Sequence, residues 1–287
     1  MSNYLKHVRS LEELHRVIDR QQEPGTQGAM ARLVTDVEAA VAAIVKKTEN
    51  IVAGIQSEAE AASERIAAEA ATTVADIRKE TTKAAVILLR DVKTGADEKS
   101  AARAAGRILK EATVSSAKLN QRAEEAVASI AEKVEAAVAK VKRVLEDAIH
   151  DLSELGKNAI RKVAEKGKEA AALFAASESD KGRHEATQKE TTKAAAKAIR
   201  SLAQDAEKVN RAAEEASAKL QKAAEDAIEM VKEAAREAAA SLERAIDEAI
   251  EKIFEVTESA IVDTVGAEEV EYFDLDALKQ KWGKKKV

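Results

Sequence analysis

Histidine and carboxylate side chains are the residues of this sequence with the best chemistry for holding a metal ion. The sequence has four histidines and 52 aspartates and glutamates. A metal site inside a helical bundle takes a Glu-x-x-His pair from each of two helices, together with further inward-facing glutamates. Glu12 and His15 have this spacing, and Asp147 and His150 have the related Asp-x-x-His spacing. Neither pair has companion ligands on a common face, so we predict no metal site.

Other catalytic patterns are missing from the sequence. The chain has no cysteine, which removes disulfides, thiolate metal ligands and cysteine nucleophiles. It contains no His-Glu-x-x-His motif, glycine-rich phosphate loop or nucleophile elbow. We interpret Thr81, Thr82, Thr191 and Thr192 as residues at the edge of a helical stripe. We therefore predict that the protein is not an enzyme, with no catalytic residue and no cofactor.

The composition is typical of long helices rather than of a globular enzyme. Charged residues make up 34% of the 287 residues, aromatic residues make up 2%, and there is one proline. An excess of Ala, Glu, Lys, Leu and Arg indicates coiled coils and long helices. The net charge is −5 and both signs are mixed along the chain, which disfavours nucleic-acid binding. Folding only on contact with a partner is the alternative that this composition leaves open.

Small and apolar residues recur along the chain in steps of four, three and four. Three such series run over Val37–Val92, Ile108–Phe174 and Thr191–Ile261, and the third includes Ile228, Ile246 and Ile250. The resulting eleven-residue repeat has about 3.67 residues per turn, close to the 3.6 of an α-helix. It predicts helices that run nearly straight and bury one narrow stripe.

The spacing fails at two places, near residues 94–97 and within residues 177–184, and both hold turn or capping residues. We therefore predict an all-α protein with three very long helices, at about 27–93, 97–176 and 184–265. At 1.5 Å per residue each helix measures roughly 100 to 120 Å. Short connections make neighbouring helices antiparallel, so the expected architecture is an elongated antiparallel bundle or coiled coil.

The segment 1–26 is predicted to be a separate amphipathic helix followed by a Pro-Gly linker. It has three possible roles: packing back onto the bundle, docking to a protein partner, or lying on a membrane surface. The residues that would carry docking are apolar and share one side, namely Leu5, Val8 and Leu11.

The C-terminal tail, residues 266–287, holds half of the six aromatic residues and ends in a lysine run. Aromatic side chains are the usual anchors of interfaces, so the tail is a candidate recognition segment, and a cap over the bundle end is the alternative. Its candidate docking residues are Tyr272, Phe273, Leu275, Leu278 and Trp282.

These features predict a structural or scaffold protein: a self-associating helical rod, as a homo-oligomer or filament, with terminal segments that dock a protein partner. The small residues of the stripe bury little area each, which favours self-association. No apolar run exceeds seven residues and the first residues lack a signal-peptide core, so we expect a cytoplasmic protein.

The alternative is a protein of lipid or granule surfaces. Between Val37 and Val265 the eleven-residue amphipathic pattern resembles apolipoproteins, perilipins, desiccation-type late-embryogenesis proteins and phasins. Three long helices behind an N-terminal amphipathic helix resemble BAR domains. These resemblances rest on composition and architecture, and they imply a lipid surface as a possible partner.

Overall fold

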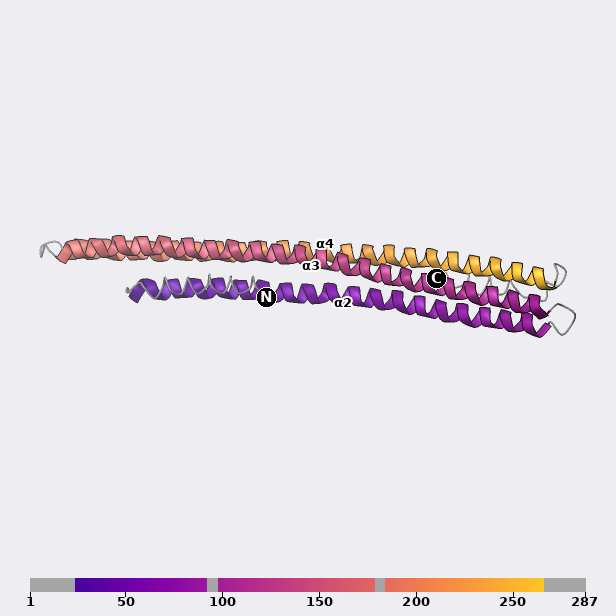
Figure 1. Cartoon of the computed structure of the whole chain (residues 1–287). Helices are drawn as coiled ribbons and strands as arrows, with labels where there is room; N and C mark the ends of the chain where they lie inside the picture. The colour runs from indigo at the N-terminus through magenta and orange to yellow at the C-terminus, as the bar shows by residue number, and fades with distance from the viewer. Residues whose placement is uncertain (1–23, 92–97, 179–183, 266–287) are drawn as a thin grey trace. The chain divides into compact units, whose positions relative to one another are not determined.

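The computed structural model describes residues 24–91, 98–178 and 184–265, and all of them are helical (Figure 1). They form α2 (Pro24–Asp91), α3 (Glu98–Glu178) and α4 (His184–Val265), of 68, 81 and 82 residues. None of the described residues lies in a strand. The prediction of an all-α protein with three long packed helices is confirmed.

The helix bounds lie close to those predicted from the repeat. α2 begins at Pro24 rather than at residue 27, so the residues predicted as a Pro-Gly linker form its first turn. Proline is well placed there, because the first turn has no internal acceptor for its missing N–H and its fixed φ suits a helix. The two predicted breaks fall between helices, and residues 92–97 and 179–183 lie outside the described residues.

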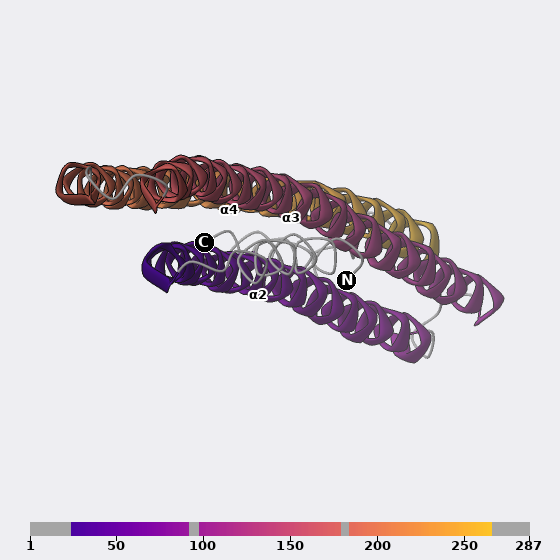
Figure 2. The same ribbon diagram turned by 90° about the vertical axis from the view of Figure 1, so that its left-hand side faces the viewer.

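The chain divides into two compact units, and each takes a segment from all three helices. Among the described residues, unit 1 comprises 24–54, 138–178 and 184–227, and unit 2 comprises 55–91, 98–137 and 228–265. Within each unit α3 and α4 run side by side, as two views at right angles show (Figures 1 and 2). In unit 2 the end of α2 meets the start of α3 and the end of α4 in one buried cluster, so α2 and α3 are antiparallel.

Large aliphatic side chains lie in one buried row on each helix, with a period of eleven residues. No member of these rows is more than 4% exposed. Because eleven residues make almost three full turns, every member returns to the same side of its helix. The rows are Ile44, Ile55, Ile66, Ile77 and Leu88 on α2; Ile108, Leu119, Ile130, Val141, Leu152 and Val163 on α3; and Val209, Leu220, Val231, Leu242 and Ile253 on α4.

A second buried row on α4 is built mainly of alanine, and we call it the alanine row. Its members are Asp205, Ala216, Ala227, Ala238, Ala249 and Ala260. The predicted stripe used Ile228, Ile246 and Ile250 in this region, and the structure leaves those three only half-buried. Alanine permits closer approach of two helices than isoleucine does. The branched residues therefore flank the contact instead of filling it.

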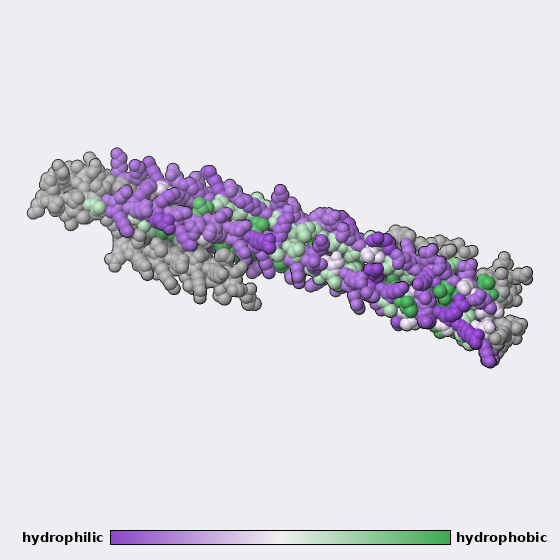
Figure 3. Space-filling model, turned by 45° about the horizontal axis from the view of Figure 1, so that its top comes forward, coloured by the Kyte–Doolittle hydropathy of each residue, from purple (hydrophilic) through white to green (hydrophobic). Residues whose placement is uncertain are grey.

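Hydrophilic residues dominate the face shown in Figure 3, with hydrophobic residues appearing between them. Across residues 24–91, 98–178 and 184–265, no helix has a stretch that is both apolar enough and long enough to cross a membrane.

Candidate functional site

The candidate docking residues at both ends of the chain lie outside the described residues. This applies to Leu5, Val8 and Leu11 in segment 1–26 and to Tyr272, Phe273, Leu275, Leu278 and Trp282 in the tail. Glu12 and His15, the pair with metal-ligand spacing, also lie there. Their roles stay predictions.

The second pair with metal-ligand spacing, Asp147 and His150, lies on α3 in unit 1. His150 is exposed, and Asp147 lines a groove of about 240 Å³ between α3 and α4 together with Asp151, Glu215 and Lys219. No group of three or more His, Cys, Asp or Glu residues in the described part of the chain has the geometry of a metal site. The structure thus brings carboxylates near Asp147 but does not assemble ligands around His150.

A larger groove, of about 410 Å³, runs between α3 and α4 in unit 2. Its charged walls include Lys118, Glu248 and Lys252, and its floor includes Ala249. Glu125 on one wall accepts hydrogen bonds of 2.9 Å from both Gln121 and Arg122. Alanines line both this groove and the one in unit 1, since short side chains leave a furrow where two helices meet.

Polar contacts join the helices within each unit. In unit 1, Lys47 Nζ of α2 donates to Ser217 Oγ at 2.7 Å and to the Ser217 carbonyl oxygen at 3.2 Å. In unit 2, Arg107 of α3 donates to Asp263 at 2.9 Å and to Ser259 Oγ at 3.0 Å, both on α4. Exposed ion pairs such as Arg107–Asp263 contribute little to stability.

Buried threonines satisfy their hydroxyl groups within their own helix. Thr48, Thr81 and Thr257 each donate to the carbonyl oxygen four residues earlier, at 2.9, 2.6 and 2.7 Å. Thr81 is 2% exposed and lies in the core, whereas Thr82 is exposed. The interpretation of Thr81 as a stripe-edge residue is therefore corrected, because back-bonding to the helix permits a threonine in the core. The side chains of Thr191 and Thr192 are not described.

Asp205 is the one charged member of the alanine row and is only 6% exposed. Its Oδ1 accepts a 2.8 Å bond from Lys208, whose side chain is 59% exposed. Its Oδ2 is buried and has no hydrogen-bond partner. The predicted stripe does not include Asp205, because it was built from apolar and small residues. Asp205 lies eleven residues before Ala216, and this spacing places the two residues on the same side of α4.

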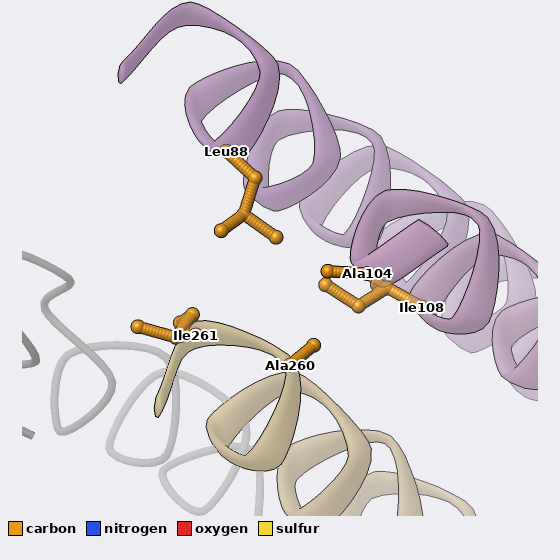
Figure 4. Close-up of a cluster of buried hydrophobic side chains, with 5 residues drawn as sticks. All are labelled: Leu88, Ala104, Ile108, Ala260 and Ile261. Atoms are coloured by element: carbon orange, nitrogen blue, oxygen red, sulfur yellow. The ribbon is translucent and has the colours of Figure 1, made fainter. Parts of the chain in front are cut away.

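Large apolar side chains come to the surface at one end of unit 2. The core there contains Leu88, Ala104, Ile108, Ala260 and Ile261 (Figure 4). Around it, six large apolar residues are between 37% and 56% exposed, and we call this set the apolar end. Its members are Val86, Ile87 and Leu89 on α2, Leu109 and Val114 on α3, and Val262 on α4.

The end of α2 explains much of this surface. Residues 84–89 read Ala-Ala-Val-Ile-Leu-Leu, so the helix is apolar on every side over this stretch. Leu88 is fully buried, while Val86, Ile87 and Leu89 point in other directions and remain exposed. A helix that is apolar all round is normally covered on all sides. The unbroken apolar run can be read from the sequence, but a search for periodic spacing does not single it out.

Comparison with known proteins adds no relative. No protein-family model matches the sequence, and no curated protein matches it significantly.

Proposed function

We propose that this chain is a non-enzymatic structural or scaffold protein of the cytoplasm: a self-associating helical spacer whose terminal segments dock a protein partner. The observation that carries the proposal is the buried row of large aliphatic residues, which repeats every eleven residues on helices of 68 to 82 residues. In a core of this kind, the same type of contact between helices is repeated every eleven residues along the helix. Such a core suits a protein whose task is to span and to present its ends.

The alanine content of the core supports association between copies. Burial of apolar area contributes about 25 cal/mol per Å², so an alanine contributes much less than a leucine. Rows such as Ala216, Ala227 and Ala238 therefore give each helix turn a small share of stability. The large aliphatic rows are already buried within one chain. Association between copies is therefore expected to add stability to a core that is already formed.

Sedimentation velocity over a wide range of protein concentration tests self-association. We expect a species heavier than one chain that grows with concentration. A single species of one chain's mass at every concentration would remove self-association from the proposal.

A lipid or granule surface is the second candidate, and the apolar end of unit 2 favours it. Interfacial helices combine large apolar residues with a basic border, and exposed Leu89 stands next to Arg90. Flotation with vesicles that contain anionic or only neutral lipids tests this function. Binding that requires anionic vesicles would support it, and failure to float with either would exclude it.

A further inference from the structure

Basic residues border the apolar end of unit 2 on α2 and α3, whereas the neighbouring part of α4 is acidic. Residues 83–91 of α2 and 98–111 of α3 carry six basic residues and three acidic ones, and residues 255–265 of α4 carry three acidic residues and no basic one. The six are Lys83, Arg90, Lys99, Arg103, Arg107 and Lys110. Glu80 pairs with Lys83 at 3.0 Å, and Asp263 of α4 pairs with Arg107 at 2.9 Å. Arg90 stands next to exposed Leu89 in the sequence, and Lys110 stands next to exposed Leu109.

The chain itself contains a segment of opposite character that begins where α4 ends. Residues 266–274 read Gly-Ala-Glu-Glu-Val-Glu-Tyr-Phe-Asp, with four acidic residues and no basic one. Within it, Val270, Tyr272 and Phe273 are apolar or aromatic. An acidic, aromatic segment complements the basic residues and exposed apolar side chains of α2 and α3 in both charge and hydrophobicity.

The attachment point of this segment is next to the apolar end. Ile261 lies in the same buried cluster as Leu88 and Ile108, and the last described residue of α4 is Val265. From Val265 to Phe273 the chain can span at most about 28 Å when fully extended. Val86 and Leu89 lie within one helical turn of Leu88, well inside that reach. A short tether also gives the segment an effective concentration of about millimolar at this surface.

We propose that residues 266–274 fold back onto the apolar end of unit 2 of the same chain. Tyr272 and Phe273 cover exposed side chains such as Val86 and Leu89, and the glutamates meet the basic residues of α2 and α3. This goes beyond the proposed function, because a partner that binds the tail then competes with the chain's own surface.

A single tryptophan placed in the docking segment tests the proposal in the full chain. Trp282 is the only tryptophan, so Trp282→Phe with Phe273→Trp moves the reporter into the segment. At low protein concentration we expect a blue-shifted emission and quenching by acrylamide several-fold slower than for free tryptophan. Emission and quenching equal to those of the free amino acid would overturn the proposal.

Two sets of substitutions locate the surface. Val86→Ser with Leu89→Ser should make the reporter accessible, whereas Ala42→Ser with Ala43→Ser, two exposed α2 positions of unit 1, should not. Circular dichroism of each variant confirms that the helices remain folded. Equal quenching in the two double variants would show that the segment does not dock on the apolar end.

A charge exchange tests the electrostatic part. Arg103→Glu with Lys110→Glu should expose the reporter, and adding Glu268→Lys with Glu269→Lys should restore its protection. Loss of protection without restoration would contradict charge pairing between the segment and this surface.

Two further measurements distinguish the other possible occupants of the apolar end, a second copy of the chain and an anionic lipid. Protection that disappears on dilution would assign the surface to a second copy of the chain. Protection that appears only with vesicles containing phosphatidylserine would assign it to anionic lipid. Either result would overturn docking within the chain.

Discussion

Asp205 in unit 1 and Ala260 in unit 2 occupy the same place in the repeat of α4, five eleven-residue periods apart. Ala260 is fully buried in a cluster with Leu88, Ala104, Ile108 and Ile261. Asp205 is nearly as buried, but its Oδ2 has no hydrogen-bond partner and its Oδ1 relies on a partly exposed lysine. One position of the repeat thus holds a methyl group in one unit and a carboxylate in the other.

The difference shows what the repeat specifies and what it does not. Eleven-residue spacing determines which side of the helix is buried, whatever the residue type. The chemistry at each buried place is then a separate matter, because an unsatisfied buried polar atom costs about 1–3 kcal/mol. We therefore expect Asp205 to cost unit 1 stability that Ala260 does not cost unit 2.

The largest expected effect comes from transferring the carboxylate to unit 2. Ala260→Asp places a charge in a fully buried apolar cluster, and we expect the free energy of unfolding to fall by about 3–5 kcal/mol. Chemical denaturation monitored by circular dichroism measures the change. Ala240→Asp, at an exposed position of α4 in the same unit, is the matched control. Equal losses in the two variants would show that burial at Ala260 is not the cause.

The reverse substitution should stabilise unit 1. Asp205→Ala completes the alanine row and removes the unpartnered oxygen, so we expect the free energy of unfolding to rise by about 1–2 kcal/mol. Lys208 loses its partner, but its exposed ammonium group remains hydrated. Asp205→Asn retains the polar atoms and should gain less than alanine does. A lower unfolding midpoint for Asp205→Ala would mean that the carboxylate supports the fold.

The smallest effect concerns two helical glycines that differ in the space around them. A Cβ at Gly106 in unit 2 meets nothing within 4 Å, whereas one at Gly156 in unit 1 lies 3.2 Å from Val37 Cγ2. Alanine is favoured over glycine inside a helix by about 0.8–1 kcal/mol. We therefore expect Gly106→Ala to raise the unfolding midpoint and Gly156→Ala to raise it less or not at all. A larger gain at Gly156 would show that Val37 moves aside freely.

Much of the fold could be predicted from the sequence, because periodicity and its interruptions depend only on the chain. The three helices and the large aliphatic residues of the stripe, such as Ile55 and Leu242, follow from spacing. Which of two neighbouring apolar residues is buried does not follow from spacing. Ala227 is buried and Ile228 is only half-buried, and which of these two neighbours faces the other helices is a property of tertiary packing.

The candidate surfaces were less accessible to sequence reasoning. Asp205 falls on the buried side of α4, but only the three-dimensional structure shows that its Oδ2 meets no donor. The apolar run that ends at Leu89 can be read directly from the sequence. Its exposure on several sides depends on how much of the helix end the other two helices cover, which local sequence does not determine.

Far-ultraviolet circular dichroism of the full chain in buffer, with no lipid and no partner, tests the central claim most directly. The claim is that the chain builds its own repeating core as a structural protein. We predict a helical content that matches helices of 68, 81 and 82 residues, with cooperative unfolding on heating. A largely unfolded spectrum that becomes helical only when vesicles or a partner are added would contradict this account.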